Sequence, residues 1–179
     1  MQGDVKKVLL TEEEIKRRVR ELGEQITKDY QQKENLLVIG ILKGSFIFLA
    51  DLIREIKLPI ELDFLIVSSY QDSSVSSGEV KIVKDIAVSA GKKNVLFVED
   101  IVDTGFTMSK IKEIFKERGA NTVKLCSLLS KPDRRKVPTE IDYEGFKIPD
   151  EFVIGYGLDF AEKYRNLPFI GVLNEAVYT

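Results

Sequence analysis

The sequence lacks histidine and has one cysteine among its 179 residues. The missing histidine excludes nucleophile systems built on Ser-His-Asp or Cys-His, and it removes the commonest zinc ligand. Cys126 alone cannot form an intrachain disulfide, and a structural zinc site is close to impossible with it as the single thiolate. Acid–base chemistry must therefore use carboxylates, lysine or tyrosine, and any metal should be a hard, oxygen-binding ion such as Mg²⁺.

An excess of charge of one sign is also missing. Lys and Arg total 27 and Asp and Glu total 29, a formal net charge of −2, so no global positive field attracts nucleic acid or an anionic membrane. The longest apolar run, Leu36–Leu42, falls far short of the roughly 20 residues that cross a bilayer. With no recognisable signal peptide and no disulfide, we expect a cytoplasmic protein without nucleic-acid or membrane partners.

Hydrophobic residues make up 44% of the chain and charged residues 31%, the balance of one globular domain over residues 1–179. Thr11 and Glu14 have the spacing of a capping box, and the apolar period that follows predicts a helix to about Tyr30. Further helices are predicted at 46–56 and 107–118, and strands at 36–42, 61–68, 80–83, 95–98, 122–129, 152–154 and 169–173. Strands that alternate with helices predict an α/β fold with a mainly parallel central sheet flanked by helices.

A polar stretch, Ser69–Gly78, separates two of the predicted strands. It offers almost no apolar side chain to anchor it, so we expect a mobile loop at the end of a β-arm.

The strand Val95–Val98 is followed by a cluster of polar residues typical of a ligand site. Glu99 and Asp100 lie at its carboxyl end, which is where open α/β sheets bind ligands. Asp103 and the turn Thr104–Thr107 come next, just before a helix, and backbone N–H groups at a helix N-terminus suit a phosphate monoester. Acids beside a phosphate would repel it, so the pattern predicts a Mg²⁺ ion or sugar hydroxyls between them.

The segment Glu99–Thr107 resembles the phosphoribosyl-pyrophosphate signature of type I phosphoribosyltransferases, and its Glu-Asp followed by Asp-Thr-Gly resembles the hypoxanthine-guanine branch. Segments that also resemble this branch are Leu42–Gly44, Ser68–Tyr70, Ser76–Val80, Lys131–Arg135 and Ile148–Asp159. The likeness runs from about residue 10 to 173, with one departure at Gln71-Asp72, where a glycine-containing stretch is expected.

This resemblance implies a type I phosphoribosyltransferase core at about 34–135, with a small hood from about 1–15 and 136–179. It implies purine salvage, in which the 5-phosphoribosyl group of phosphoribosyl pyrophosphate passes to hypoxanthine or guanine and pyrophosphate leaves. It further implies a requirement for Mg²⁺ and a homo-oligomer, a dimer or a tetramer.

The resemblance also assigns residues to the donor. Thr104–Thr107 would bind the 5′-phosphate, and Glu99 and Asp100 would hold the ribose hydroxyls and a Mg²⁺ on the diphosphate. Asp103 would be the general base that takes the proton from purine N7. The Leu42–Lys43 peptide is often cis in this family. The full donor set is Lys43, Gly44, Ser69, Tyr70, Glu99, Asp100, Ile101, Asp103, Thr104, Gly105, Phe106, Thr107 and Arg165.

The purine would be bound by Lys131, Phe152, Val153 and Asp159. An ammonium group only donates hydrogen bonds, so Lys131 suits the O6 acceptor of a 6-oxopurine and disfavours adenine. Phe152 would stack on the ring, backbone carbonyls of Val153 and Asp159 would accept from the guanine 2-amino group, and the Asp159 carboxylate would serve a second Mg²⁺.

Three alternatives compete with this interpretation. A xanthine-preferring transferase differs only in details of the purine pocket. A non-catalytic, nucleotide-sensing regulator of the same fold would bind RNA, which the negative net charge disfavours. A phosphoacceptor receiver-like domain is shorter and has its acidic pair after the first strand, where this chain has Leu42–Gly44.

Overall fold

The computed structural model describes residues 2–69 and 80–177. Its centre is a six-stranded sheet, in which β3, β2, β5, β6 and β7 run parallel and β4 pairs antiparallel with β3 at one edge. In spatial order the strands are β4 (Val80–Lys84), β3 (Glu61–Ser69), β2 (Leu36–Leu42), β5 (Asn94–Val102), β6 (Thr122–Ser130) and β7 (Tyr143–Lys147). The predicted α/β architecture is confirmed.

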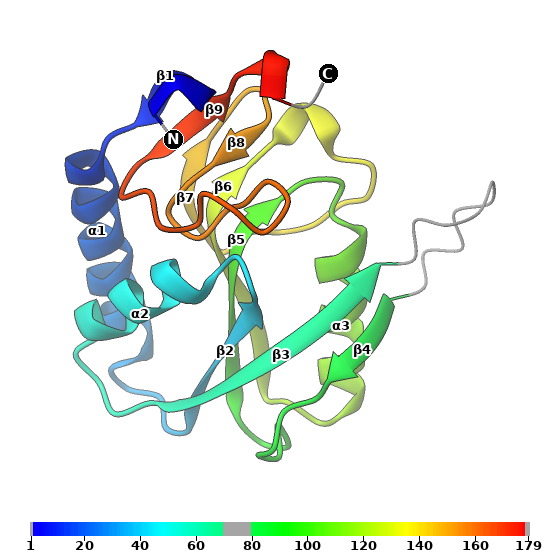
Figure 1. The fold of residues 1–179 in the computed structure, drawn as a ribbon. Coiled ribbons are helices and arrows are strands. Elements are labelled where there is room, and N and C mark those ends of the chain that lie inside the picture. Colours follow the sequence, from blue (N-terminus) through cyan, green and yellow to red (C-terminus); the bar gives the residue numbers. More distant parts are fainter. Residues whose placement is uncertain (1, 70–79, 178–179) are drawn as a thin grey trace.

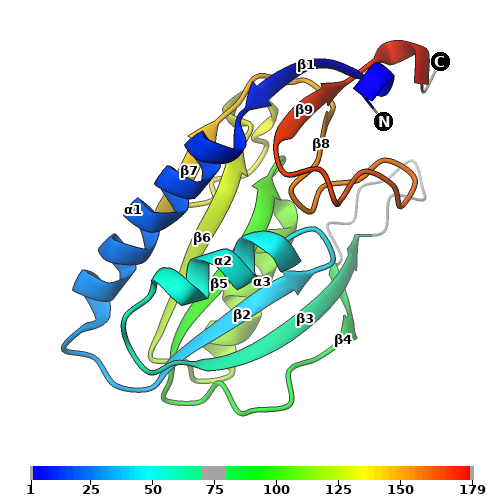
Figure 2. The same ribbon diagram turned by 60° about the vertical axis from the view of Figure 1, so that its left-hand side comes forward.

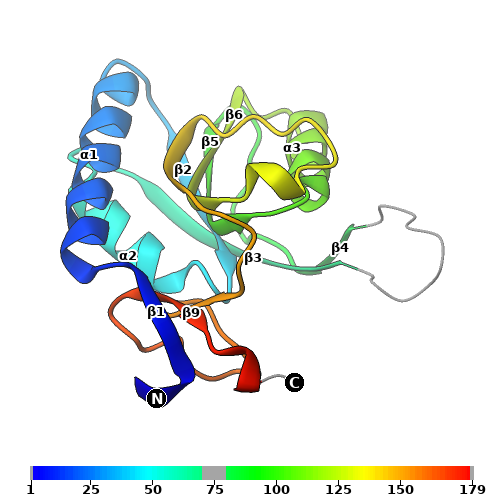
Figure 3. The same ribbon diagram turned by 90° about the horizontal axis from the view of Figure 1, so that it is seen from above.

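Helices cover both faces of this sheet. Helices α1 (Glu12–Tyr30) and α2 (Phe46–Glu55) lie on one face and α3 (Phe106–Glu117) on the other (Figure 3). Successive side chains of β2 alternate between the two apolar cores, since Val38 packs in the core of α1 and α2 and Ile39 packs in that of α3. A strand buried on both faces has no need of polar residues, which explains its uninterrupted apolar run. No helix in the described ranges is long and apolar enough to cross a membrane.

The first helix has the predicted bounds and the predicted cap. The Glu14 N–H donates to the Thr11 hydroxyl at 3.2 Å, and the Thr11 N–H donates to the Glu14 carboxylate at 2.8 Å. The apolar stripe that includes Ile15, Leu22 and Ile26 is fully buried against the sheet and α2. Burial of this stripe, more than the cap, holds the helix to the domain.

A small antiparallel sheet, β1-β9-β8, lies beyond the carboxyl ends of the large sheet's parallel strands (Figures 1 and 2). It consists of β1 (Val5–Leu10), β9 (Ile170–Leu173) and β8 (Val153–Ile154). Its strands come from segments near both ends of the described residues, and it lies beyond the sheet edge that carries the site described below. The division into a core at about 34–135 and a hood on either side stays a prediction, and β7 within the second hood segment pairs with β6 in the large sheet.

Strands β3 and β4 form the predicted arm, and Ser69 pairs with Val80 at its end. The loop expected between them lies outside the described residues. Residues 2–69 and 80–177 also include three short 3₁₀ helices, at Gln2–Asp4, Pro132–Arg134 and Glu175–Val177.

Candidate active site

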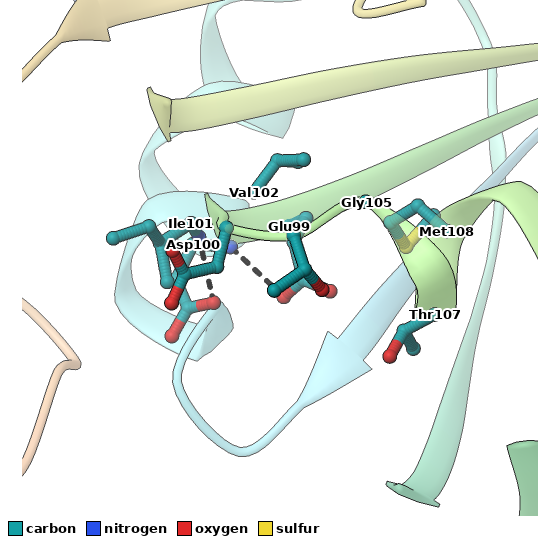
Figure 4. A pocket seen from close by; sticks show the side chains of 9 residues that line it. Glu99, Asp100, Ile101, Val102, Gly105, Thr107 and Met108 are labelled. Atoms are coloured by element: carbon teal, nitrogen blue, oxygen red, sulfur yellow. Dashed lines mark hydrogen bonds between the residues drawn. The ribbon is translucent and has the colours of Figure 1, made fainter. Parts of the chain in front are cut away.

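The turn between β5 and α3 lines a pocket of about 160 Å³ at the carboxyl edge of the sheet. In Figure 4 the side chains of Glu99 and Thr107 point to the same side of this turn. The lining residues are Glu99, Asp100, Ile101, Val102, Asp103, Thr104, Gly105, Thr107 and Met108. Most of the residues that the sequence assigned to the donor therefore face one pocket, and Glu99 and Asp100 are part of β5 itself rather than following it.

Gly105 makes the turn possible. Its φ of +88° favours glycine, and a Cβ there would lie 2.3 Å from the Thr139 hydroxyl oxygen. The same hydroxyl donates to the Gly105 carbonyl at 3.0 Å, and the Lys136 N–H donates to the Thr104 carbonyl at 2.9 Å. The segment 136–139 thus fixes the turn that leads into α3. The helix begins at Phe106, and its N-cap residue, Gly105, makes no side-chain hydrogen bond to the helix. The first N–H groups of α3 are oriented as an anion site requires.

Glu99 and Asp100 are adjacent acids with little compensation. Glu99 is only 9% exposed, and its carboxylate accepts the Asp100 N–H at 3.1 Å, while Asp100 accepts the Ile101 N–H at 2.8 Å. Burial, and next the negative charge of Asp100, raises the pKa of Glu99 well above its ordinary value; burial also raises the pKa of Asp100. Such a pair favours a cation or hydroxyl donors beside it.

The loop after β2 packs directly on these acids. A Cβ on Gly44 would lie 1.7 Å from an Asp100 carboxylate oxygen, and a Cβ on Gly157 (φ +101°) would lie 2.1 Å from the Gly44 carbonyl oxygen. Glycine at both places therefore lets β2, β5 and the hood meet. The Leu42–Lys43 peptide is cis, as in many members of the family that the sequence resembles.

Two cations on this side share one carboxylate. The Lys43 ammonium lies 2.8 Å from one oxygen of Glu162, and the Arg165 guanidinium lies 3.2 Å from the other. Arg165 also contacts the Asp159 carboxylate at 3.0 Å and donates to the Gly157 carbonyl at 2.9 Å. The basic residues predicted for the diphosphate are thus brought together.

On the other side of the turn, a chain of alternating charges leads to Lys131. Arg134 Nε lies 3.0 Å from Asp103 Oδ1, and its terminal nitrogen lies 3.3 Å from Asp150. Asp150 in turn lies 3.5 Å from the ammonium of Lys131, which follows β6 and is buried. Asp103 Oδ1 has no hydrogen-bond partner among the described residues, so Arg134 is its ionic neighbour rather than an aligned donor.

Phe152 is 44% exposed and meets Phe160 edge to face, with ring centroids 5.7 Å apart. The next residue, Val153, is in contrast buried at the start of β8. Ser69 ends β3, and Tyr70 lies outside the described residues.

In the described ranges, no three acidic, histidine or cysteine side chains converge as they would around a metal. Glu99, Asp100 and Asp159 therefore do not form one three-carboxylate site. The Glu99–Asp100 pair nevertheless offers the hard oxygen ligands that Mg²⁺ prefers, and burial raises the pKa of both carboxyls.

Sequence reasoning gave no role to Arg134, Asp150 or Glu162. Arg134 and Asp150 lie inside segments that carried the resemblance, so a charged side chain within such a segment was the signal that could have marked them as site residues. Glu162 lies 119 residues from its partner Lys43, and no local spacing reveals such a pair.

Comparisons with known proteins agree with this geometry. The model of the family described as "Phosphoribosyl transferase domain" matches residues 7–161. The hypoxanthine-guanine phosphoribosyltransferase of Bacillus subtilis (strain 168) is 52% identical over 178 residues, 99% of this chain and 98% of that protein. A crystal structure of hypoxanthine phosphoribosyltransferase from Staphylococcus aureus is 51% identical, with a TM-score of 0.96 and coverage of 100% of this chain and 97% of that one.

A hypoxanthine phosphoribosyltransferase mutant from Trypanosoma cruzi, solved as a ternary substrates complex, is 40% identical, with a TM-score of 0.94 over 99% of this chain and 100% of that one. The chain belongs to the phosphoribosyltransferase family. Within the family it belongs to the hypoxanthine-guanine branch, and its activity is that branch's purine salvage reaction.

Proposed function

We propose that this chain joins hypoxanthine or guanine to the 5-phosphoribosyl group of phosphoribosyl pyrophosphate at the β5–α3 turn, with Mg²⁺ as its metal. The products are IMP or GMP and pyrophosphate. One observation carries the assignment of the site. The Gly44 loop packs against Asp100 on one side of the turn, and on the other side Asp103 is linked through Arg134 and Asp150 to Lys131. A donor and a base bound to these two sides meet over Asp103.

The 5′-phosphate binds at the start of α3, where Thr104–Thr107 offer backbone N–H groups and hydroxyls. Glu99 and Asp100 accept hydrogen bonds from the ribose hydroxyls. These contacts satisfy the two carboxylates that burial and mutual repulsion otherwise disfavour in their ionised form. Lys43 and Arg165 bind the diphosphate and offset the charge that develops on it as it leaves.

Asp103 holds the purine proton. Its carboxylate accepts the N7 proton as N9 bonds to the ribose carbon. Histidine fills this role in many enzymes, and in this chain, which has none, a carboxylate is the best remaining candidate. Lys131 donates to the purine O6, Phe152 stacks on the ring, and the Val153 and Asp159 carbonyls accept from a 2-amino group.

Glu99 and Asp100 would hold one Mg²⁺ and Asp159 a second, and Mg²⁺ would supply positive charge that stabilises the leaving diphosphate. The oxygen donors and the uncompensated charge of the Glu99–Asp100 pair support this assignment. A homo-oligomer, a cytoplasmic location and a mobile loop at 69–78 stay predictions.

Pyrophosphate release tests the proposal, with phosphoribosyl pyrophosphate and Mg²⁺ and with hypoxanthine, guanine, xanthine, adenine or no base. Release with hypoxanthine and guanine alone is the expected result and supports Lys131 as the reader of the 6-oxo group. Efficient release with xanthine would favour the xanthine-preferring alternative. Nucleotide binding without release from any base would favour the regulator, and retention on RNA at physiological salt would then be measured.

A further inference from the structure

Glu162 lies between the two cations that the proposed function assigns to the diphosphate. One carboxylate oxygen is 2.8 Å from the Lys43 ammonium, and the other is 3.2 Å from the Arg165 guanidinium. We infer that Glu162 takes the place of the diphosphate's charge in the free enzyme and weakens the enzyme's hold on pyrophosphate by competing for both cations. This inference rests on the proposed function and adds to it a residue that sets the affinity for donor and product.

A tight backbone turn fixes the position of the Glu162 carboxylate. Phe160 and Lys163 exchange N–H to carbonyl hydrogen bonds of 3.1 and 3.0 Å across a two-residue turn. Ala161 and Glu162 form that turn with φ values of +49° and +65°, the pattern of a type I′ turn, which favours Asn-Gly. Residues other than glycine in this region are strained, and such strain gathers at functional sites.

Asp159 supports the same turn. Its carboxylate accepts the Glu162 N–H at 2.9 Å while its other oxygen contacts Arg165 at 3.0 Å. The turn, its anchoring carboxylate and one of the two cations therefore form a single unit. This unit holds the Glu162 side chain over the loop after β2, where Lys43 lies.

The pairing is suited to exchange with a substrate. The side chains of Lys43 and Glu162 are both 65% exposed, so water and salt weaken their attraction and a multiply charged diphosphate displaces the carboxylate. The hydrogen bond from Lys43, ahead of the opposing effect of burial, lowers the pKa of Glu162, so the carboxylate is ionised at neutral pH. When pyrophosphate is the product, the same carboxylate competes for the cations and favours its release.

The experiment compares Glu162→Gln with the unaltered enzyme, with inorganic pyrophosphate and Mg²⁺ as the calorimetric probe. We expect the pyrophosphate Kd to fall about 2- to 5-fold, as the loss of an exposed ion pair allows. The KM for phosphoribosyl pyrophosphate falls similarly, the KM for hypoxanthine does not change, and the difference in Kd shrinks at high salt. Glu113→Gln is the matched control, because Glu113 is 57% exposed and pairs with Lys110 at 3.1 Å on α3.

Glu162→Asn is the second variant. Asparagine removes the charge but tolerates positive φ, so it should tighten pyrophosphate binding as glutamine does even if glutamine disturbs the turn. An unchanged Kd in both variants would overturn the inference, and so would weaker binding, which would mean that Glu162 aligns the cations. Failure of the proposed function is a separate result, namely no pyrophosphate release by the unaltered enzyme with any purine.

Discussion

The carboxylates around the active site fall into two groups that differ in their surroundings. Glu99 and Asp100, at the end of the sheet, are buried next to each other, and their pKa values are raised. Three carboxylates on the hood side are more exposed, and each contacts a lysine or arginine that is proposed to bind substrate. They are Asp150, Asp159 and Glu162. Under the proposed function, substrate and metal would therefore add missing charge compensation at the sheet, whereas at the hood substrate would exchange one ion pair for another.

This difference separates two ways of binding the same substrate. At the sheet, the protein holds an unfavourable charge arrangement that a ligand relieves, so binding and stability are coupled. At the hood, the cations are already satisfied, so the free protein is not destabilised and the affinity for anions is moderated. The arrangement at the hood suits a reaction that must release pyrophosphate, because it lowers the affinity for that product.

Asp103→Asn is expected to have the largest effect, because Asp103 lies between the two groups and is proposed to act on the purine proton. Loss of general-base catalysis lowers kcat about 10²- to 10⁴-fold. The Kd for phosphoribosyl pyrophosphate, measured by calorimetry, stays nearly unchanged. Asp133→Asn, at a neighbouring exposed acid, is the control. A loss of donor affinity as large as the loss of kcat would contradict the assignment and make Asp103 a donor ligand.

Lys131→Ala comes next and tests the purine side alone. A hydrogen bond from a charged donor contributes about 1.5–3 kcal/mol, so the KM for hypoxanthine should rise about 10- to 100-fold. The KM for the donor should not change. Lys136→Ala removes an exposed lysine nearby and is the control. An unchanged hypoxanthine KM would remove Lys131 from the purine site.

Much of the sheet-side arrangement could be predicted from the sequence, because it is local. The cap of α1 depends on Thr11 and Glu14, three residues apart, and the site turn depends on consecutive residues after a strand. The family resemblance then indicated which substrate such a turn binds. The helix and the turn were found where these short-range patterns predicted them.

The hood was predicted only in part. Its strands at 152–154 and 169–173 were found as β8 and β9, but β1, and β7 at the edge of the large sheet, were not predicted, because each depends on pairing with another segment of the chain. Strand β1 has the sequence VKKVLL, whose alternation is weak, and it is a strand because it pairs with β9 at the other end of the chain. Strand β7 has the sequence YEGFK and likewise depends on pairing with β6. The ion pairs of Glu162 and Arg134 depend on this folding, so they were visible only in the structure.

Asp150→Asn tests whether exchange of ion pairs is a general property of the hood. Asp150 contacts Lys131 at 3.5 Å and Arg134 at 3.3 Å, so removing its charge frees Lys131 for the purine. We expect the hypoxanthine KM to fall about 2- to 5-fold, because Asp150 is half-exposed and solvent weakens its attraction to Lys131. The donor KM should stay constant in the same steady-state assay. A higher hypoxanthine KM would show that Asp150 aligns Lys131, and would confine the exchange to Glu162.

Glu99→Gln tests the sheet side through stability, without Mg²⁺ or substrate. The raised pKa of Glu99 means that its favourable contribution is complete below the pKa of the unfolded chain and is lost as the pH rises through the folded-state value. Glutamine carries no such cost, so the variant should have a higher Tm at pH 8 than the unaltered protein, by about 2–4 °C for each 1 kcal/mol gained. The gain should diminish towards pH 4.

Asp63→Asn provides the opposite case and completes the test. Burial of Asp63, which is 8% exposed, raises its pKa, but backbone N–H groups of Phe64, Val88 and Ala87 and the charge of Lys84 together outweigh burial and lower it. Its contribution is present above the unfolded-state pKa and is lost as the pH falls through the folded-state value, so neutralisation should lower the Tm at pH 8. If Glu99→Gln also lowered the Tm there, the buried pair would already be compensated without substrate or metal, and the contrast between sheet and hood would fail.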